Sequence, residues 1–233
     1  MIDENFKIIE EKINETCIKT NRKIDDITLV AVSKNNNISS ISEAYSAGIL
    51  NFGENKAQEL RDKSKLVKEN VIWHFIGHLQ TNKVKYIIDT AEYIHSVDSV
   101  KLTEEINKRA TGIDKIQKIL IEINTSGENS KYGIKNLDEL NNITNHYLGL
   151  SNIELVGLMT MAPFIENENI IRESFIRLRE YKEELNKQGL QLTELSMGMT
   201  NDYQIAIEEG ATMLRIGTAI FGKRDYSLTW RDE

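Results

Sequence analysis

The chain has 233 residues, of which 40% are apolar and 28% are charged, which is the composition of an ordinary globular protein. Its net charge of −7 argues against a general affinity for nucleic acid or for anionic membrane surfaces. No apolar run approaches the roughly 20 residues of a membrane span, and the amino-terminal residues do not resemble a signal peptide. The single cysteine, Cys17, excludes an internal disulfide and is compatible with a reducing cytoplasm.

The first predicted element is an amino-terminal helix. Ile2, Phe6, Ile9, Ile13 and Cys17 recur at helical spacing and would form one apolar face. On that face Cys17 is expected to be a packed core thiol rather than a nucleophile. This helix precedes the first predicted strand, so it is an addition to the repeating pattern that follows.

Short apolar runs then alternate with helical patterns along the rest of the chain. Ser40 and Glu43 predict a capping box at the start of the first helix of this series. Alternating strands and helices imply a parallel sheet, and eight such units predict a closed (β/α)8 TIM barrel. The whole chain, 1–233, is therefore expected to be a single domain. The predicted strands lie near 28–33, 49–53, 71–76, 93–97, 118–123, 153–158, 194–197 and 212–216.

The first predicted strand ends at Lys34, and this lysine is the leading candidate for a functional residue. Barrels build their ligand sites at the carboxyl ends of the strands, and a lysine amine forms Schiff bases with carbonyl compounds. The alternative is a solvated surface charge. Arg215 is the second unusual residue, because it lies between Leu214 and Ile216 in the last strand, where a charge needs a partner.

The loops after the last two predicted strands are rich in glycine and hydroxyl residues. Ser196, Gly198 and Thr200 lie in the first loop, and Gly217 and Thr218 lie in the second. Barrels often bind phosphate with these loops, since glycines let backbone N–H groups approach an anion and hydroxyls add donors. Tight turns and helix caps use the same residues, so a structural role is the alternative. Together with the strand-end lysine, the loops favour a phosphorylated carbonyl compound as ligand.

A series of motifs covers almost the entire chain in order. The segments are 29–34 (LVAVSK), 51–55 (NFGEN), 73–83 (WHFIGHLQTNK), 128–133 (ENSKYG), 157–163 (GLMTMAP), 196–202 (SMGMTND) and 215–222 (RIGTAIFG). Their order and spacing closely resemble the pyridoxal 5′-phosphate (PLP) homeostasis protein family. This resemblance implies a barrel like the amino-terminal domain of alanine racemases, with PLP as cofactor.

The resemblance also implies a set of cofactor-binding residues. Lys34 would form the Schiff base, and Arg215 would face the pyridine nitrogen. Ser196, Gly217 and Thr218 would contact the phosphate. The other residues expected at the cofactor are Asn55, His74, Met159 and Gly198.

The function that the resemblance implies is PLP homeostasis in the cytoplasm. The protein would hold PLP as a Schiff base on Lys34 and release it to PLP-dependent apo-enzymes, without established turnover and without catalytic residues. We expect a monomer that binds neither nucleic acid nor membranes. The family usually carries Thr-Lys-Pro or a similar run after the lysine. Asn35, Asn36 and Asn37 stand there in this chain, which predicts a less rigid loop. Lys131 is a further candidate for loading or release, with a solvated loop lysine as the alternative.

The main alternative is a small racemase-like PLP enzyme of fold type III. An arginine that faces the pyridine nitrogen can only donate, so the ring would be a weaker electron sink. Racemases of this fold also use a tyrosine from a second domain as a base, whereas only 223–233 follow here. Tyr226 in this tail is expected to cap the barrel, which leaves His74 and His78 as candidate bases.

Two further classes of function remain as alternatives. A regulatory module acting through protein partners would need an exposed apolar patch, which a sequence does not reveal. A metal site is not expected, because the four histidines lie on different predicted elements and Cys17 is remote from them. These histidines are His74, His78, His95 and His146.

Overall fold

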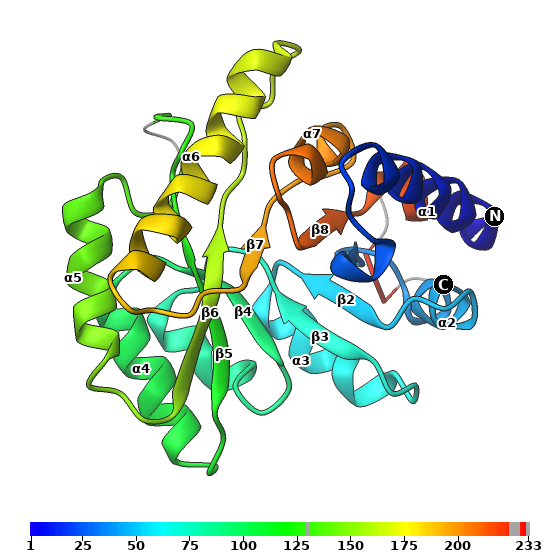
Figure 1. The fold of residues 1–233 in the computed structure, drawn as a ribbon. Helices are drawn as coiled ribbons and strands as arrows, with labels where there is room; N and C mark the ends of the chain where they lie inside the picture. Colours follow the sequence, from blue (N-terminus) through cyan, green and yellow to red (C-terminus); the bar gives the residue numbers. More distant parts are fainter. Residues whose placement is uncertain (129–130, 224–228, 232–233) are drawn as a thin grey trace.

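The computed structural model describes residues 1–128, 131–223 and 229–231. Its centre is a closed barrel of eight parallel strands in sequence order, in which β8 pairs with β1 (Figure 1). The predicted (β/α)8 barrel is therefore confirmed. Tyr226 and positions 129–130 lie outside the described residues. The strands are β1 Thr28–Val32, β2 Asn51–Glu54, β3 Ile72–Phe75, β4 Tyr93–Val97, β5 Gln117–Glu122, β6 Ile153–Met159, β7 Glu194–Ser196 and β8 Met213–Ile216.

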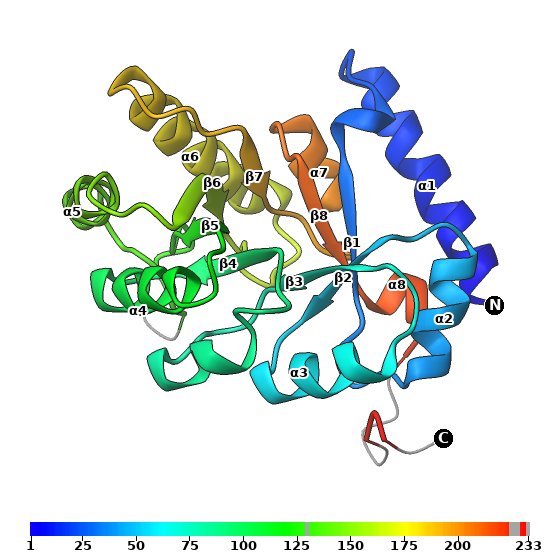
Figure 2. The ribbon, with the colours of Figure 1, turned by 90° about the horizontal axis from the view of Figure 1, so that it is seen from below.

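Helices surround the barrel, and the predicted additional helix, α1, packs beside α2, α7 and α8 (Figure 2). The connection after β3 contains a 3-10 helix, η2, in place of an α-helix. Within the described part of the chain, no helix is both long and apolar enough to span a membrane. The helices are α1 Ile2–Lys19, η1 Ile24–Asp26, α2 Ile38–Ser46, α3 Ala57–Leu66, η2 Thr81–Tyr86, α4 Val100–Thr111, α5 Leu137–Tyr147, α6 Glu168–Lys187, α7 Tyr203–Glu208 and α8 Thr218–Phe221.

The core has two parts. The larger lies between the barrel wall and the helices, where the apolar face of α1, with Cys17 fully buried, also packs. The smaller is a cluster of buried side chains from β5, β6 and β8, and it fills part of the barrel interior. Its members are Leu120, Val156, Met159 and Met213.

The predicted capping box at Ser40 is wrong. Helix α2 begins at Ile38, and its N-cap is Asn37, whose side chain accepts a hydrogen bond from Ser40 N at 3.0 Å. Glu43 cannot close a capping box with Asn37, because it lies one turn too far along the helix. Its carboxylate instead accepts a hydrogen bond from Ile2 N at 3.1 Å, which ties the amino terminus to α2.

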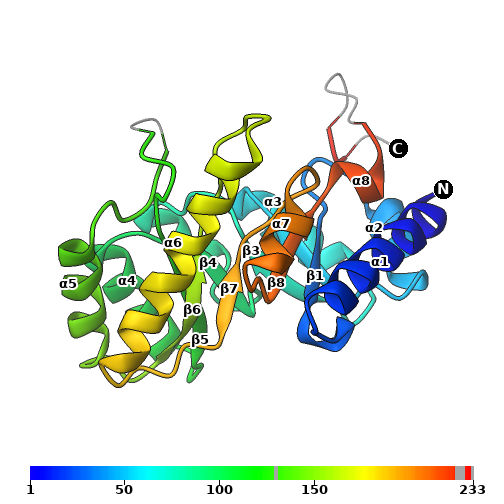
Figure 3. The same ribbon diagram turned by 45° about the horizontal axis from the view of Figure 1, so that its top comes forward.

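Parallel strands direct all their carboxyl ends to one face, and the loops after β5 and β6 and helix α8 rise along this edge in Figure 3. The polar strand ends identified in the sequence therefore meet in space. The opposite face carries a surface groove of about 490 Å³ whose lining includes Asn51, Tyr93 and Lys118. The candidate site involves residues from both ends of the barrel.

Gly198 is required by the backbone. Its φ of +93° lies in the left-handed region, and an added Cβ would lie 2.6 Å from Ala206 Cβ and 3.0 Å from Leu214 Cδ2. We expect Gly198→Ala to lower the free energy of unfolding by roughly 2–3 kcal/mol, because backbone strain and overpacking add. Urea denaturation would measure the loss. A change below about 0.5 kcal/mol, the range of neutral surface substitutions, would contradict this prediction.

Candidate functional site

A cavity of about 280 Å³ lies at the carboxyl end of the barrel. Of the nine sequence-predicted site residues, it brings together Lys34, Arg215, Gly217 and Thr218. It thus combines a lysine amine, a guanidinium, a hydroxyl and apolar surface in one enclosure of small-molecule size. The other lining residues are Val32, Ala162, Pro163, Phe164, Met199, Thr200, Asn201 and Asp202.

The turn that carries Lys34 is fixed by its three asparagines. Asn35 adopts a left-handed φ of +63°, which asparagine tolerates better than most residues, and its backbone N–H donates to Glu59 Oε1 at 2.7 Å. Asn36 Nδ2 donates to the carbonyl oxygen of Lys34 at 3.4 Å, and Asn37 caps α2. The asparagine run therefore supplies specific contacts within the turn, and the lower rigidity expected from the sequence stays a prediction.

A buried ionic cluster lies directly behind this turn. The ammonium of Lys63, fully buried on α3, lies 2.8 Å from Glu54 Oε1 and 2.8 Å from Glu59 Oε1. It also donates to the carbonyl oxygen of Ser33 at 2.8 Å, and Ser33 Oγ donates to Glu54 Oε1 at 2.7 Å. We call Glu54, Glu59 and Lys63 the buried triad. It contacts Ser33 and Asn35, so it holds the turn on both sides of Lys34.

The buried triad carries one more carboxylate than ammonium. Burial raises the pKa of Glu54 to about 7, with Lys63 opposing the rise and Glu59 adding to it. Glu54 Oε2 has no hydrogen-bond partner among the described residues. None of these three residues was among the site residues predicted from the sequence. The NFGEN motif contains Glu54, but a lysine on an amphipathic helix is ordinarily exposed, so no signal pointed to Lys63.

Arg215 is buried, with 4% of its surface exposed. Its guanidinium donates to Ser196 Oγ at 2.6 Å and to the carbonyl oxygen of Thr160 at 2.8 Å. Burial lowers the pKa of Arg215 to about 10, against the opposing effect of Asp202 and Glu122, so it remains a cation at neutral pH. The sequence predicted that a charge at Arg215 needs a partner. Its hydrogen-bond partners are two neutral oxygens, and the carboxyl groups of Asp202 and Glu122 act on it from farther away.

Ser196 and His74 do not line the cavity. Both are fully buried and belong to a row of hydrogen bonds that starts at Arg215 and continues through His95. Ser196 Oγ lies 2.8 Å from His95 Nδ1, His95 Nε2 lies 2.9 Å from His74 Nδ1, and His74 Nε2 lies 3.0 Å from Asn51 Oδ1. His74 and His95 lie on different elements, as predicted, and the parallel pairing of β3 with β4 brings the two rings together.

The remaining predicted residues do not line this cavity. Asn55 lines a separate cavity of about 270 Å³ together with His78, and its buried Oδ1 has no hydrogen-bond partner among the described residues. Met159 packs in the interior cluster. Gly198 contributes its carbonyl oxygen, which accepts from Arg215 N at 2.9 Å. His78 stacks on Tyr132 with ring centroids 3.7 Å apart, so neither candidate base lies in the cavity wall.

Thr200, which the sequence placed in a candidate phosphate loop, and Asp202, which it did not single out as a site residue, both line the cavity. Asp202 Oδ1 accepts a hydrogen bond from Met199 N at 2.5 Å, which closes the loop after β7. Burial raises the pKa of Asp202 from its usual value. The motif SMGMTND contained both residues. The spacing of these residues did not reveal that the second half of the loop after β7, which contains Thr200 and Asp202, faces the cavity.

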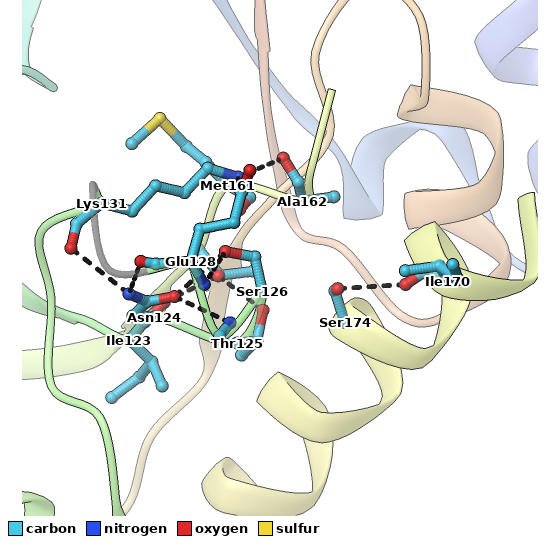
Figure 4. A network of polar contacts seen from close by, with 12 residues as sticks. Ile123, Asn124, Thr125, Ser126, Glu128, Lys131, Met161, Ala162, Ile170 and Ser174 are labelled. Carbon is cyan, nitrogen blue, oxygen red and sulfur yellow. Dashed lines mark hydrogen bonds and ion pairs between the residues drawn. The ribbon is translucent and has the colours of Figure 1, made fainter. Parts of the chain in front are cut away.

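Near the cavity, Lys131 connects the loop after β5 to the loop after β6 by hydrogen bonds (Figure 4). Its ammonium donates to the carbonyl oxygens of Ala162 at 3.0 Å and Met161 at 3.4 Å, and it lies 2.5 Å from Glu128 Oε2. Asn124 Nδ2 donates to the carbonyl oxygens of Lys131 and Glu128 and so orders the base of the same loop. These contacts support a structural role for Lys131.

The buried carboxyl group of Glu122 makes the stability of the fold depend on pH. Burial raises its pKa to about 7, with Asp98 adding to the rise and Arg215 opposing it. A carboxyl whose folded-state pKa is raised stabilises the fold below its unfolded pKa of about 4.5 and loses this contribution as the pH rises through 7. The loss approaches about 3 kcal/mol above pH 7, since one pKa unit is worth about 1.4 kcal/mol.

We therefore expect Glu122→Gln to gain stability relative to the parent protein as the pH rises from 5 to 8. Urea denaturation at pH 5, 6, 7 and 8 would measure the difference in unfolding free energy. Glu154→Gln is the control, because Glu154 is exposed on the neighbouring strand β6. A difference that does not change with pH would show that Glu122 does not titrate in this range.

Comparison with known proteins is consistent with this geometry. Residues 10–225 match the family model described as alanine racemase, N-terminal domain. A pyridoxal phosphate homeostasis protein of Aquifex aeolicus is 42% identical over 227 residues, covering 96% of this chain and 98% of the relative. A protein of the same name from Haemophilus influenzae is 39% identical over 235 residues, covering 98% of each chain.

Two solved structures are similar over most of the chain. PipY of Synechococcus elongatus, solved with PLP bound, has a TM-score of 0.85 and 31% identity, covering 95% of this chain and all of PipY. An alanine racemase of Clostridium difficile has a TM-score of 0.79 at 13% identity and covers 99% of this chain but 59% of the racemase. The second likeness concerns the fold alone.

Proposed function

The chain belongs to the pyridoxal phosphate homeostasis proteins, and from this membership we propose that it binds PLP in the cavity beside Lys34 and holds it for release. When bound, PLP supplies an aldehyde that condenses reversibly with amines. The observation that carries the proposal is the meeting of Lys34 and Arg215 in one cavity with Gly217 and Thr218.

The residues present fit the cofactor. Lys34 offers the amine, and the cationic Arg215 offers N–H donors to a neutral ring nitrogen. Thr200 and Thr218 place hydroxyl donors around the loops that we assign to the phosphate. Val32, Met199 and Phe164 add apolar surface for an aromatic ring. The buried Oδ1 of Asn55 has no partner among the described residues, and we propose it as a further acceptor for the ligand.

We propose that the protein is a carrier rather than an enzyme. The titratable groups in the described cavity wall are Lys34, Asp202 and Arg215. Arg215 only donates, and Asp202 Oδ1 is held by a backbone N–H of its own loop, so we assign the role of base to Lys34 and assign no second base to the opposite face. Proton transfer on both faces of a substrate needs two such groups. We further propose that PLP-dependent apo-enzymes receive the cofactor.

The test is the absorption spectrum of the purified protein with PLP, followed by borohydride reduction and mapping of the labelled peptide. The expected result is a single label on Lys34. Incubation of the loaded protein with L- and D-alanine is expected to release PLP without racemisation. Label scattered over surface lysines would overturn the assignment of the site, and sustained racemisation would overturn the carrier function.

A further inference from the structure

Arg215 is one end of a row of polar side chains that crosses the barrel, all of them buried except the half-buried Asn51 at the other end. Its other members come from β7, β4, β3 and β2, and consecutive polar atoms lie 2.6–3.0 Å apart. The row reaches Asn51, which lines the groove on the opposite face of the barrel. A set of buried polar groups of this length is costly unless every donor and acceptor is satisfied.

We propose that this row is one directed hydrogen-bond chain that fixes the guanidinium of Arg215 where it lines the cavity. Ser196, His95 and His74 are its positioning residues. Ser196 consequently acts on the cofactor through Arg215 and does not contact the phosphate. The part of this inference that concerns the cofactor rests on the proposed function.

The direction of the chain follows from its first member. Arginine has no acceptor, so Ser196 Oγ accepts from Arg215. The serine has one proton, and its other described partner is His95 Nδ1. If Ser196 donates to His95 Nδ1, its hydroxyl is fully used, and its proton is not available to an anion in the cavity.

The two histidine rings continue the hydrogen-bond chain in the same direction, from Ser196 toward Asn51. Burial lowers the pKa of His74 to about 3 and lowers that of His95 well below its usual value, so both rings are neutral. A neutral ring that accepts at Nδ1 donates at Nε2. His95 Nε2 therefore donates to His74 Nδ1, and His74 Nε2 donates to Asn51 Oδ1.

The opposite direction leaves groups unsatisfied. If His95 Nδ1 carried the proton, Ser196 Oγ would receive two donors, and its own proton would have no described acceptor. His74 Nε2 would then need a donor, although Asn51 presents its amide oxygen. The direction from Arg215 to Asn51 satisfies each of these atoms. In this direction the lone pairs of Ser196 Oγ face the cation, and the aligned hydrogen bonds polarise one another.

The first experiment uses the free protein, so it does not depend on PLP. We would label the histidines with 15N in a His78→Asn/His146→Asn background, which leaves His74 and His95. The expected long-range 1H–15N spectrum shows two neutral rings protonated at Nε2, unchanged between pH 5 and 8. Ser196→Ala should shift His95 Nδ1 and leave the ring neutral. A ring protonated at Nδ1, or one that titrates in this range, would overturn the directed chain.

The second experiment compares PLP with pyridoxal, which lacks the phosphate. Ser196→Ala is expected to weaken both ligands by the same factor, about tenfold, because an acceptor of a charged donor is lost. Thr218→Val, at a proposed phosphate contact, should weaken PLP alone. Ser96→Ala is the matched control, since Ser96 is equally buried and donates to Gly77 O at 2.6 Å, outside the chain.

The outcomes separate the two proposals. A loss in Ser196→Ala that appears with PLP and vanishes with pyridoxal would make Ser196 a phosphate ligand and overturn its positioning role. Unchanged affinity for both ligands would overturn that role as well. A parent protein that binds neither ligand at Lys34 would refute the proposed function, while the histidine spectra would still decide the direction of the chain.

Discussion

Replacing Lys34 with alanine is expected to abolish covalent PLP binding and to weaken total binding roughly 100-fold or more, equivalent to about 2.7 kcal/mol. Lys34 supplies the one amine in the described cavity wall, so no other lining residue can form the link. Absorption titration and borohydride labelling would measure the two effects. The fold should be retained, because Lys34 lies in a turn and contributes no buried core.

Two companion variants sharpen this prediction. Lys34→Arg retains the positive charge but offers no suitable nucleophile at neutral pH, so it separates the covalent contribution from the electrostatic one. Lys101→Ala, on the exposed face of α4, should bind like the parent protein. Retained covalent labelling in Lys34→Ala, at Lys131 or elsewhere, would show that the cavity is not the primary site.

Lys63→Met is expected to destabilise the fold by about 3–5 kcal/mol at pH 8, the second large effect. The substitution leaves Glu54 and Glu59 close together in a buried site without their cation. The folded-state pKa of Glu54 should then rise further above its unfolded value. The resulting penalty is present above about pH 4.5 and should shrink as the pH falls toward it, because the carboxyl groups become protonated in both states.

Denaturation by urea at pH 5 and pH 8 would test this. The double variant Lys63→Met/Glu54→Gln should recover part of the stability, since it removes one uncompensated carboxylate. Lys65→Met, exposed on the same helix, is the control. A loss below about 1 kcal/mol at pH 8 would mean that the buried triad is not a stabilising unit.

The effect of Lys63→Met on PLP binding would show whether the buried triad positions the turn. Ser33 and Asn35 flank Lys34 and receive contacts from this cluster, so its loss should weaken binding even under conditions where the variant remains folded. A folded variant with unchanged affinity would limit the buried triad to stability. Affinity should therefore be measured at a temperature well below the unfolding transition of the variant.

Much of the fold was predictable from local pattern. Apolar runs bounded by polar residues, such as 28–33, are buried on both sides of a barrel wall, and β1 Thr28–Val32 lies there. The helical spacing of Leu102, Ile106 and Ala110 in the sequence likewise matches α4, which buries all three. Element ends were less well predicted, as with the N-cap at Asn37, because several neighbouring polar side chains can compete for the same helix N–H groups.

The sequence by itself determined the barrel, the family and the strand-end positions of Lys34, Arg215, Gly217 and Thr218, because these follow from hydrophobic period and motif order. It could not determine which polar residues point inward. His95 and Ser196 lie 101 positions apart, and only closure of the barrel brings them within 2.8 Å. Burial then removes water as the alternative partner, so tertiary structure decided the directed chain and the role of Lys63.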